Sequence, residues 1–195
     1  EPYASSACEM VAEILQYIRE GIKIKNVEAD CMYAGIMVDT DNFLTKTGVR
    51  TFEAAAFLRR CGADVTRVRK TFRTELEDYK AKTEVVQGAE IYKGFAFAIC
   101  NGDGMESPTI LGAQAANELL NILGVRASMV LTSYKGQTFV SARSIDEVNV
   151  QLIMEKLGGG GHANIAGVQM ECTPEAARTV IKQTIDEMIE GGELT

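Results

Sequence analysis

Four consecutive glycines followed by a histidine form the strongest chemical motif of this sequence. Gly158, Gly159, Gly160 and Gly161 directly precede His162, which is the only histidine in the chain. A glycine run costs conformational entropy, but without β-carbons its backbone N–H groups can approach a phosphate or a nucleobase. An imidazole at its rim can donate to a phosphate oxygen or to a leaving group. We therefore predict ligand contacts from Gly158 to His162, with His162 as the candidate catalytic group. A flexible turn that caps the preceding helix is the alternative.

The segment Ser141-Ala142-Arg143-Ser144 is a second candidate for phosphate binding. Arg143 ends a predicted strand, and Ser144 with Glu147 three residues later has the capping-box pattern of a helix N-terminus. A guanidinium beside the positive end of a helix suits a phosphate. A capped helix with a surface arginine explains this motif equally well when it is taken alone.

Asp39 is a candidate metal ligand at the polar end of the apolar segment 35–38. Carboxylates in such positions commonly bind Mg²⁺ or Mn²⁺. One carboxylate does not make a site, and the chain has a single histidine. Taken alone, the pattern therefore favours a helix cap or a turn at this position.

Composition limits the classes of partner. A formal net charge of −7 argues against long nucleic acid, although a small phosphate ligand remains compatible with it. The five cysteines are widely spaced, as expected for small buried side chains in a reducing cytoplasm. No window approaches the roughly 20 apolar residues of a membrane helix, so we expect a cytoplasmic segment without membrane contact.

The elements that must position these residues change character along the chain. The first part is predicted to be mainly helical, with helices from Ser6 to Gly21, from Thr51 to Arg60 and from Asp64 onward. The apolar run 32–38 is too short to be assigned to helix or strand. The charged stretch 71–88 marks a domain boundary or, alternatively, a solvated helix.

Beyond residue 88 the pattern alternates between strand and helix, which predicts an α/β sheet with helices packed on it. Strands are expected at 94–100, 128–132, 138–142 and 165–170. Helices are expected after Ser107, Ser144 and Thr173, the first with its apolar face reaching Leu123.

Taken together, these motifs resemble the DHH phosphoesterase family. Residues 35–43 and 47–58 look like the last metal-binding motif of a DHH domain and the helix after it. Residues 141–144, 147–151 and 158–162 look like the DHH-associated substrate domain. With the start Glu1-Pro2-Tyr3-Ala4-Ser5-Ser6, the combination is most similar to the GdpP type of cyclic di-AMP phosphodiesterase.

The resemblance implies the C-terminal portion of a DHH domain over residues 1–80 and a DHH-associated α/β substrate-binding domain over residues 81–195. It also implies hydrolysis of cyclic di-AMP to linear pApA with two Mn²⁺ ions. By this resemblance Asp39 would be a metal ligand. The implied substrate contacts are Ser141, Arg143, Ser144, Asn149, Gly158, Gly159, Gly160, Gly161 and His162.

The DHH triplet and the earlier Asp-rich metal motifs are absent from these residues and would precede Glu1. We therefore expect at most a partial metal site and no activity from this chain alone. The intact protein would be anchored in the membrane by N-terminal helices, and a homodimer is compatible with the sequence. Two alternatives stay open: an oligoribonuclease or 3'-phosphoadenosine 5'-phosphate phosphatase of the same superfamily, and a non-catalytic nucleotide-binding module.

Overall fold

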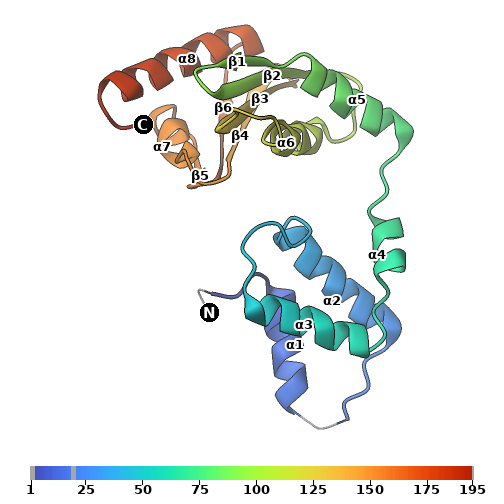
Figure 1. The fold of residues 1–195 in the computed structure, drawn as a ribbon. Coiled ribbons are helices and arrows are strands. Elements are labelled where there is room, and N and C mark those ends of the chain that lie inside the picture. Colours follow the sequence, from blue (N-terminus) through green and yellow to red (C-terminus); the bar gives the residue numbers. More distant parts are fainter. Residues whose placement is uncertain (1–2, 19–20, 195) are drawn as a thin grey trace. The chain divides into compact units, whose positions relative to one another are not determined.

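A computed structural model describes residues 3–18 and 21–194, so Glu1 and Pro2 of the first resemblance motif lie outside the described residues. The chain divides into two compact units, Glu1–Thr74 and Glu75–Thr195 (Figure 1). The division falls inside the charged stretch that the sequence marks as a boundary. Residues 76–80, expected in the first part, begin a helix of the second unit.

The first unit is helical. It contains α1 (Ala7–Ile18), α2 (Asn26–Asp39), α3 (Val49–Arg60) and α4 (Val65–Thr71). The predicted start of α1 is confirmed, because Ser6 Oγ accepts the Glu9 N–H at 3.0 Å. The apolar run 32–38 is part of α2. A small core of Ala12, Ala29, Ile36, Ala54, Leu58 and Ala63 holds the unit together.

Helix α3 starts earlier than predicted. Gly48 is its N-cap, and Thr51, expected there, lies three residues further on. Its Oγ1 accepts the Gly48 N–H at 3.1 Å, so the threonine still satisfies a free donor of the helix N-terminus.

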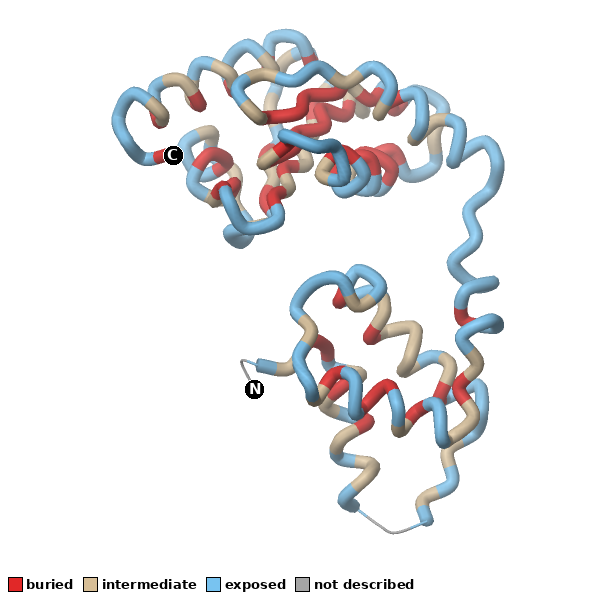
Figure 2. The backbone as a smooth tube through the Cα atoms, viewed as in Figure 1, coloured by how far each residue is buried: buried red, intermediate tan, exposed pale blue. Residues whose placement is uncertain are grey.

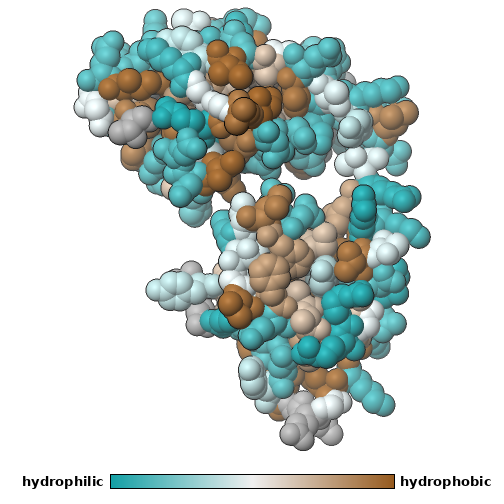
Figure 3. Space-filling view, in the orientation of Figure 1, coloured by the Kyte–Doolittle hydropathy of each residue, from teal (hydrophilic) through white to brown (hydrophobic). Residues whose placement is uncertain are grey.

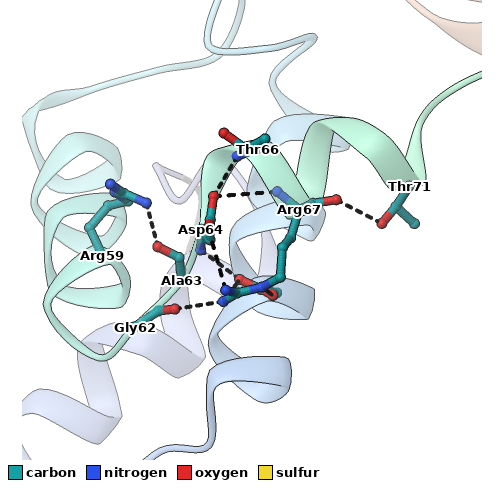
Figure 4. Close-up of polar contacts among 8 residues, drawn as sticks. Arg59, Gly62, Ala63, Asp64, Thr66, Arg67 and Thr71 are labelled. Carbon is teal, nitrogen blue, oxygen red and sulfur yellow. Dashed lines mark hydrogen bonds and ion pairs between the residues drawn. The ribbon is translucent and has the colours of Figure 1, made fainter.

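Helix α4 begins at Val65, as the sequence predicts. The Asp64 carboxylate accepts the Thr66 N–H at 2.7 Å (Figure 4). Arg67 then ties α4 to the rest of the unit, since its Nε donates to Asp30 of α2 at 2.7 Å and its Nη2 donates to the Gly62 carbonyl at 2.9 Å.

The second unit is a six-stranded mixed sheet with helices on both faces, which confirms the predicted α/β class. Its elements are α5 (Leu76–Gln87), β1 (Glu90–Tyr92), β2 (Phe95–Asn101), α6 (Pro108–Leu119), β3 (Ala127–Tyr134), β4 (Gln137–Ser144), α7 (Val150–Lys156), β5 (Gly160–His162), β6 (Ile165–Met170) and α8 (Pro174–Glu190). The strand order is β1-β2-β3-β4-β6-β5, and only β2 and β3 are parallel.

The two faces of the sheet have separate cores. Helices α7 and α8 pack on one face against side chains such as Phe97, Leu131 and Val140. Helices α5 and α6 pack on the other face against Ala96, Ala98 and Val130. Figure 2 shows these buried residues gathered on the strands and on the inward sides of the helices.

Several predicted details are wrong. Helix α6 ends at Leu119, so Leu123 is fully exposed instead of facing the core. Helix α7 begins at Val150, and Ser144 is the last residue of β4. The short strands β1 and β5 were not predicted.

On the face that Figure 3 shows, hydrophobic and hydrophilic residues are interspersed on the surface of each unit. Among the helices of the described residues, none combines the length and the apolar character that crossing a membrane requires.

Candidate phosphate-binding site

Strand register brings Arg143 and His162 onto one face of the sheet. Arg143 of β4 pairs with Ile165 of β6, and Ile165 pairs with His162 of β5. Residues directly opposite each other on neighbouring strands point to the same face, and two strand spacings separate Arg143 and His162 by about 10 Å. The adjacent row of the same face contains Ser141, Gly167 and Gly160.

The helices α5 and α6 cover this face less completely over β4, β6 and β5 than over β2 and β3. Ser141 pairs with Val130, which lies in the core beneath α5 and α6, so both point to the α6 side. There Ser141 and Arg143 are half-buried and His162 is exposed, whereas Val130 is fully buried. The sheet therefore presents an accessible polar surface beside α6.

Arg143 is a half-buried cation without an acidic partner. Its Nη1 donates a hydrogen bond to the Ala142 carbonyl at 2.8 Å. Within residues 3–18 and 21–194 no carboxylate forms an ion pair with it. Burial lowers the pKa of its guanidinium, which nevertheless remains charged at neutral pH. A partly desolvated cation of this kind favours an anionic ligand.

The four glycines do not form an open loop. The N–H groups of Gly158 and Gly159 donate to the carbonyls of Glu155 and Met154 and so cap α7. Gly158 has a φ of 84°, as is common for the residue after a helix end. Gly160 and Gly161 belong to β5. The N–H groups of Gly158 and Gly159 are therefore not free for a ligand.

The space available to a β-carbon differs from one of these glycines to the next. A β-carbon at Gly159 would lie 2.2 Å from the Gly167 carbonyl oxygen, and one at Gly161 would lie 2.4 Å from the Ile165 oxygen. A β-carbon at Gly160 would meet no atom within 4 Å. Internal packing therefore explains glycine at 159 and 161, while at 160 the space is free for a ligand.

Ser144 and Asn149 have structural partners. Ser144 is buried on the opposite face from Arg143, and its Oγ donates to the Ala163 carbonyl at 3.5 Å. Asn149, instead of Ser144, is the N-cap of α7, because its Oδ1 accepts the Gln151 N–H at 3.1 Å. The predicted convergence of Arg143 with a helix that starts at Ser144 is therefore wrong.

Ile165 is a further candidate site residue, which the sequence motifs do not indicate. It lies between Arg143 and His162 in their row and is 47% exposed, so its apolar side chain is available to a ligand. Ala163 and Asn164 form the turn between β5 and β6, and this dipeptide is not among the strong hairpin signals. Because the sequence does not predict this hairpin, it does not predict the register of β5 against β6 either.

Asp39 lies in the first unit, as the exposed last residue of α2. An exposed carboxylate suits a Mn²⁺ ion as one oxygen ligand. The described part of the chain contains no group of three or more His, Cys, Asp or Glu residues that could hold a metal ion. Asp39 alone therefore does not make a metal site within the described residues.

Residues 97–191, which include most of this mixed sheet and the accessible face, match the DHHA1 domain. The chain is therefore a DHHA1-domain protein, with a helical N-terminal part followed by the mixed sheet. It is similar to the cyclic-di-AMP phosphodiesterase GdpP of Geobacillus thermodenitrificans, with 42% identity over 98% of this chain and 30% of that protein. It is also 41% identical to the cyclic-di-AMP phosphodiesterase PdeA of Listeria monocytogenes, over 88% of this chain and 26% of that protein.

The chain thus spans less than a third of the length of these curated relatives. Among solved structures, an exopolyphosphatase-related protein from Bacteroides fragilis superposes with a TM-score of 0.86, over 96% of this chain and 58% of that one. At 22% identity, this similarity supports the fold alone.

Proposed function

We propose that the second unit holds a cyclic dinucleotide for hydrolysis and that the intact protein is a Mn²⁺-dependent cyclic di-AMP phosphodiesterase. The observation that carries this proposal is Arg143, a half-buried cation on the sheet face that also presents His162, with no acidic partner among the described residues. The relatives named as cyclic-di-AMP phosphodiesterases favour this dinucleotide as the substrate.

In the proposed complex, Arg143 pairs with one phosphate of the dinucleotide. The exposed His162 donates a proton to a phosphate oxygen or to the leaving 3'-oxygen. The side chain of Ser141 adds a hydrogen bond from the adjacent row, in which Gly160 leaves space for the ligand. Ile165 between them offers an apolar contact to a base. These groups hold one phosphodiester in a fixed orientation.

Asp39 would be one carboxylate ligand of the metal centre in the intact protein. The bound ions would generate hydroxide and stabilise negative charge on the phosphoryl oxygens. Hydrolysis of one phosphodiester would then give linear pApA. The chain's own contribution to that centre is the single carboxylate at the end of α2.

Substitution of Arg143 and of His162 in the intact protein tests this proposal. Arg143→Ala should weaken cyclic di-AMP binding by about one to two decades, because a charge-assisted hydrogen bond to phosphate is lost. His162→Ala should lower kcat/KM by a similar factor. Binding is measured by isothermal titration calorimetry, hydrolysis by chromatography and folding by circular dichroism.

Arg178→Ala is the matched control, since Arg178 lies on α8 and pairs with Glu90. This substitution removes a cation that lies away from the proposed face, so the affinity for cyclic di-AMP should not change. Folded Arg143→Ala and His162→Ala variants that process cyclic di-AMP like the wild type would disprove the proposed face. Short RNA added as a competitor separates this activity from that of an oligoribonuclease.

A further inference from the structure

Every exposed position of α1 carries an apolar or aromatic side chain. These positions are Ala7, Val11, Ile14, Tyr17 and Ile18. Val11, Ile14 and Ile18 recur at the spacing of one helix face, and they are 46%, 56% and 67% exposed. The outward face of a surface helix normally carries charged and polar side chains. A contiguous apolar face of this kind is typical of a surface that another protein segment covers.

The inward side of α1 has the opposite composition. Glu9 is the only charged residue that is buried in the described part of the chain. The core of the first unit takes Ala12 from this helix, with the half-buried Cys8 packed beside it. The side of α1 that faces its own unit therefore carries small or polar side chains, and its β-branched ones face outward.

The first unit has few large side chains in its own core. Four of the six core residues are alanines, and the full set is Ala12, Ala29, Ile36, Ala54, Leu58 and Ala63. Alanine buries little apolar area, and a small unit gains only marginal stability from a single core. Cover over the outward face of α1 would therefore add apolar area where the unit lacks it.

A hollow of about 560 Å³ lies along this face, between α1 and α3. Ile14, Tyr17 and Ile18 line it from α1, and Arg50 is among the residues that line it from α3. The Arg50 Nε donates to the Glu13 carboxylate at 2.6 Å, so these two charges at the rim pair with each other. An apolar centre with paired charges at its edge is the composition of a protein–protein contact.

We propose that the outward face of α1 docks a segment of the intact polypeptide that lies outside these 195 residues. The chain spans less than a third of the curated relatives, so most of their length lies beyond the matched part. A segment of the same polypeptide meets α1 at a high effective concentration, which favours it over a second molecule. Its apolar side chains cover Val11, Ile14 and Ile18, and its polar ones stay at the rim beside Arg50. The inference does not depend on the proposed substrate.

The test compares the intact protein with the 195-residue chain by hydrogen–deuterium exchange of Ala7–Ile18. A covered helix opens less often, so these amides should exchange about tenfold more slowly in the intact protein. Ile14→Lys keeps a good helix former but places a charge in the contact. It should lower the melting temperature of the intact protein and leave that of the 195-residue chain unchanged. If intact Ile14→Lys does not fold, Ile14→Ala is compared in the same two forms.

Val180→Lys is the matched control, since Val180 is a 40% exposed apolar residue on α8 of the second unit. It should leave the melting temperature of both forms near the wild-type value. Equal exchange of α1 in the two forms, or equal effects of the Ile14 variant on both, overturns the inference. Protection of α1 in the 195-residue chain that rises with protein concentration would assign the face to a second copy, which also overturns it.

Discussion

At the residue scale, the glycine run separates into positions with different physical reasons for glycine. Gly158 supplies a left-handed helix end, and Gly159 and Gly161 permit close approach of β5 to β6. Gly160 has neither requirement, so at this position the proposed ligand would be the reason for glycine.

This difference predicts opposite outcomes for two alanine substitutions. Gly159→Ala places a β-carbon 2.2 Å from the Gly167 carbonyl oxygen and should destabilise the fold by about 1–3 kcal/mol. Gly160→Ala meets no atom within 4 Å and should leave the melting temperature near the wild-type value. Its cyclic di-AMP affinity should fall about tenfold, since a methyl group then occupies the ligand's space. Wild-type affinity in Gly160→Ala would mean that the run serves packing only.

The sequence predicts some residues of the candidate site on β4, β5 and β6, but not all of the residues that lie beside them. The glycine run and Arg143 are visible as motifs because they are unusual in composition. The opposite orientation of Ser144 follows from strand alternation once β4 is known to extend to that residue. Ile165 could not be predicted, because its position depends on the register of β5, whose three residues are mostly glycine.

At the element scale, helices with strong end signals were predicted well and the others shifted. Thr173-Pro174 and Asp64 mark the starts of α8 and α4, where side-chain oxygens accept backbone N–H groups. The capping-box pattern at Ser144 predicts the start of a helix. Ser144 is instead the last residue of β4, where it pairs with β3. Tertiary pairing outweighs a local cap of about 1 kcal/mol in such cases.

Helix α7 offers a test of whether Asn149 is a cap, a ligand contact or both. Asn149→Ala should lower stability by about 1 kcal/mol, because the Gln151 N–H loses its acceptor. Asn149→Ser retains a capping oxygen and should melt close to the wild type. Thermal unfolding and cyclic di-AMP titration of both variants are the measurements. Weak binding by a fully stable Asn149→Ser would identify the amide as a ligand contact, and normal binding would limit Asn149 to the cap.

At the scale of the whole molecule, the two units carry different parts of the proposed chemistry. In the proposal, the first unit contributes Asp39 and the second contributes the sheet face with Arg143 and His162. The sequence predicts a two-part chain from its change in composition. The place of the division, between Thr74 and Glu75, follows from the packing of α5 against α6 and β2.

This distribution predicts that the 195-residue chain binds but does not hydrolyse. With Asp39 as the only assigned metal ligand, it should show no measurable Mn²⁺-dependent cleavage of cyclic di-AMP. It should still bind the dinucleotide through the second unit. Calorimetry and chromatography of the products on the same preparation distinguish these outcomes. Efficient Mn²⁺-dependent cleavage by this chain would contradict the assignment of Asp39 as an isolated ligand.

The sheet of the second unit ends on both sides in strands of three residues, β1 and β5. A long, flat edge strand exposes unpaired backbone groups that can recruit strands of other molecules. Edges this short give an incoming strand few groups to bond. By this reasoning, the shortness of β1 and β5 disfavours edge-to-edge aggregation of the domain.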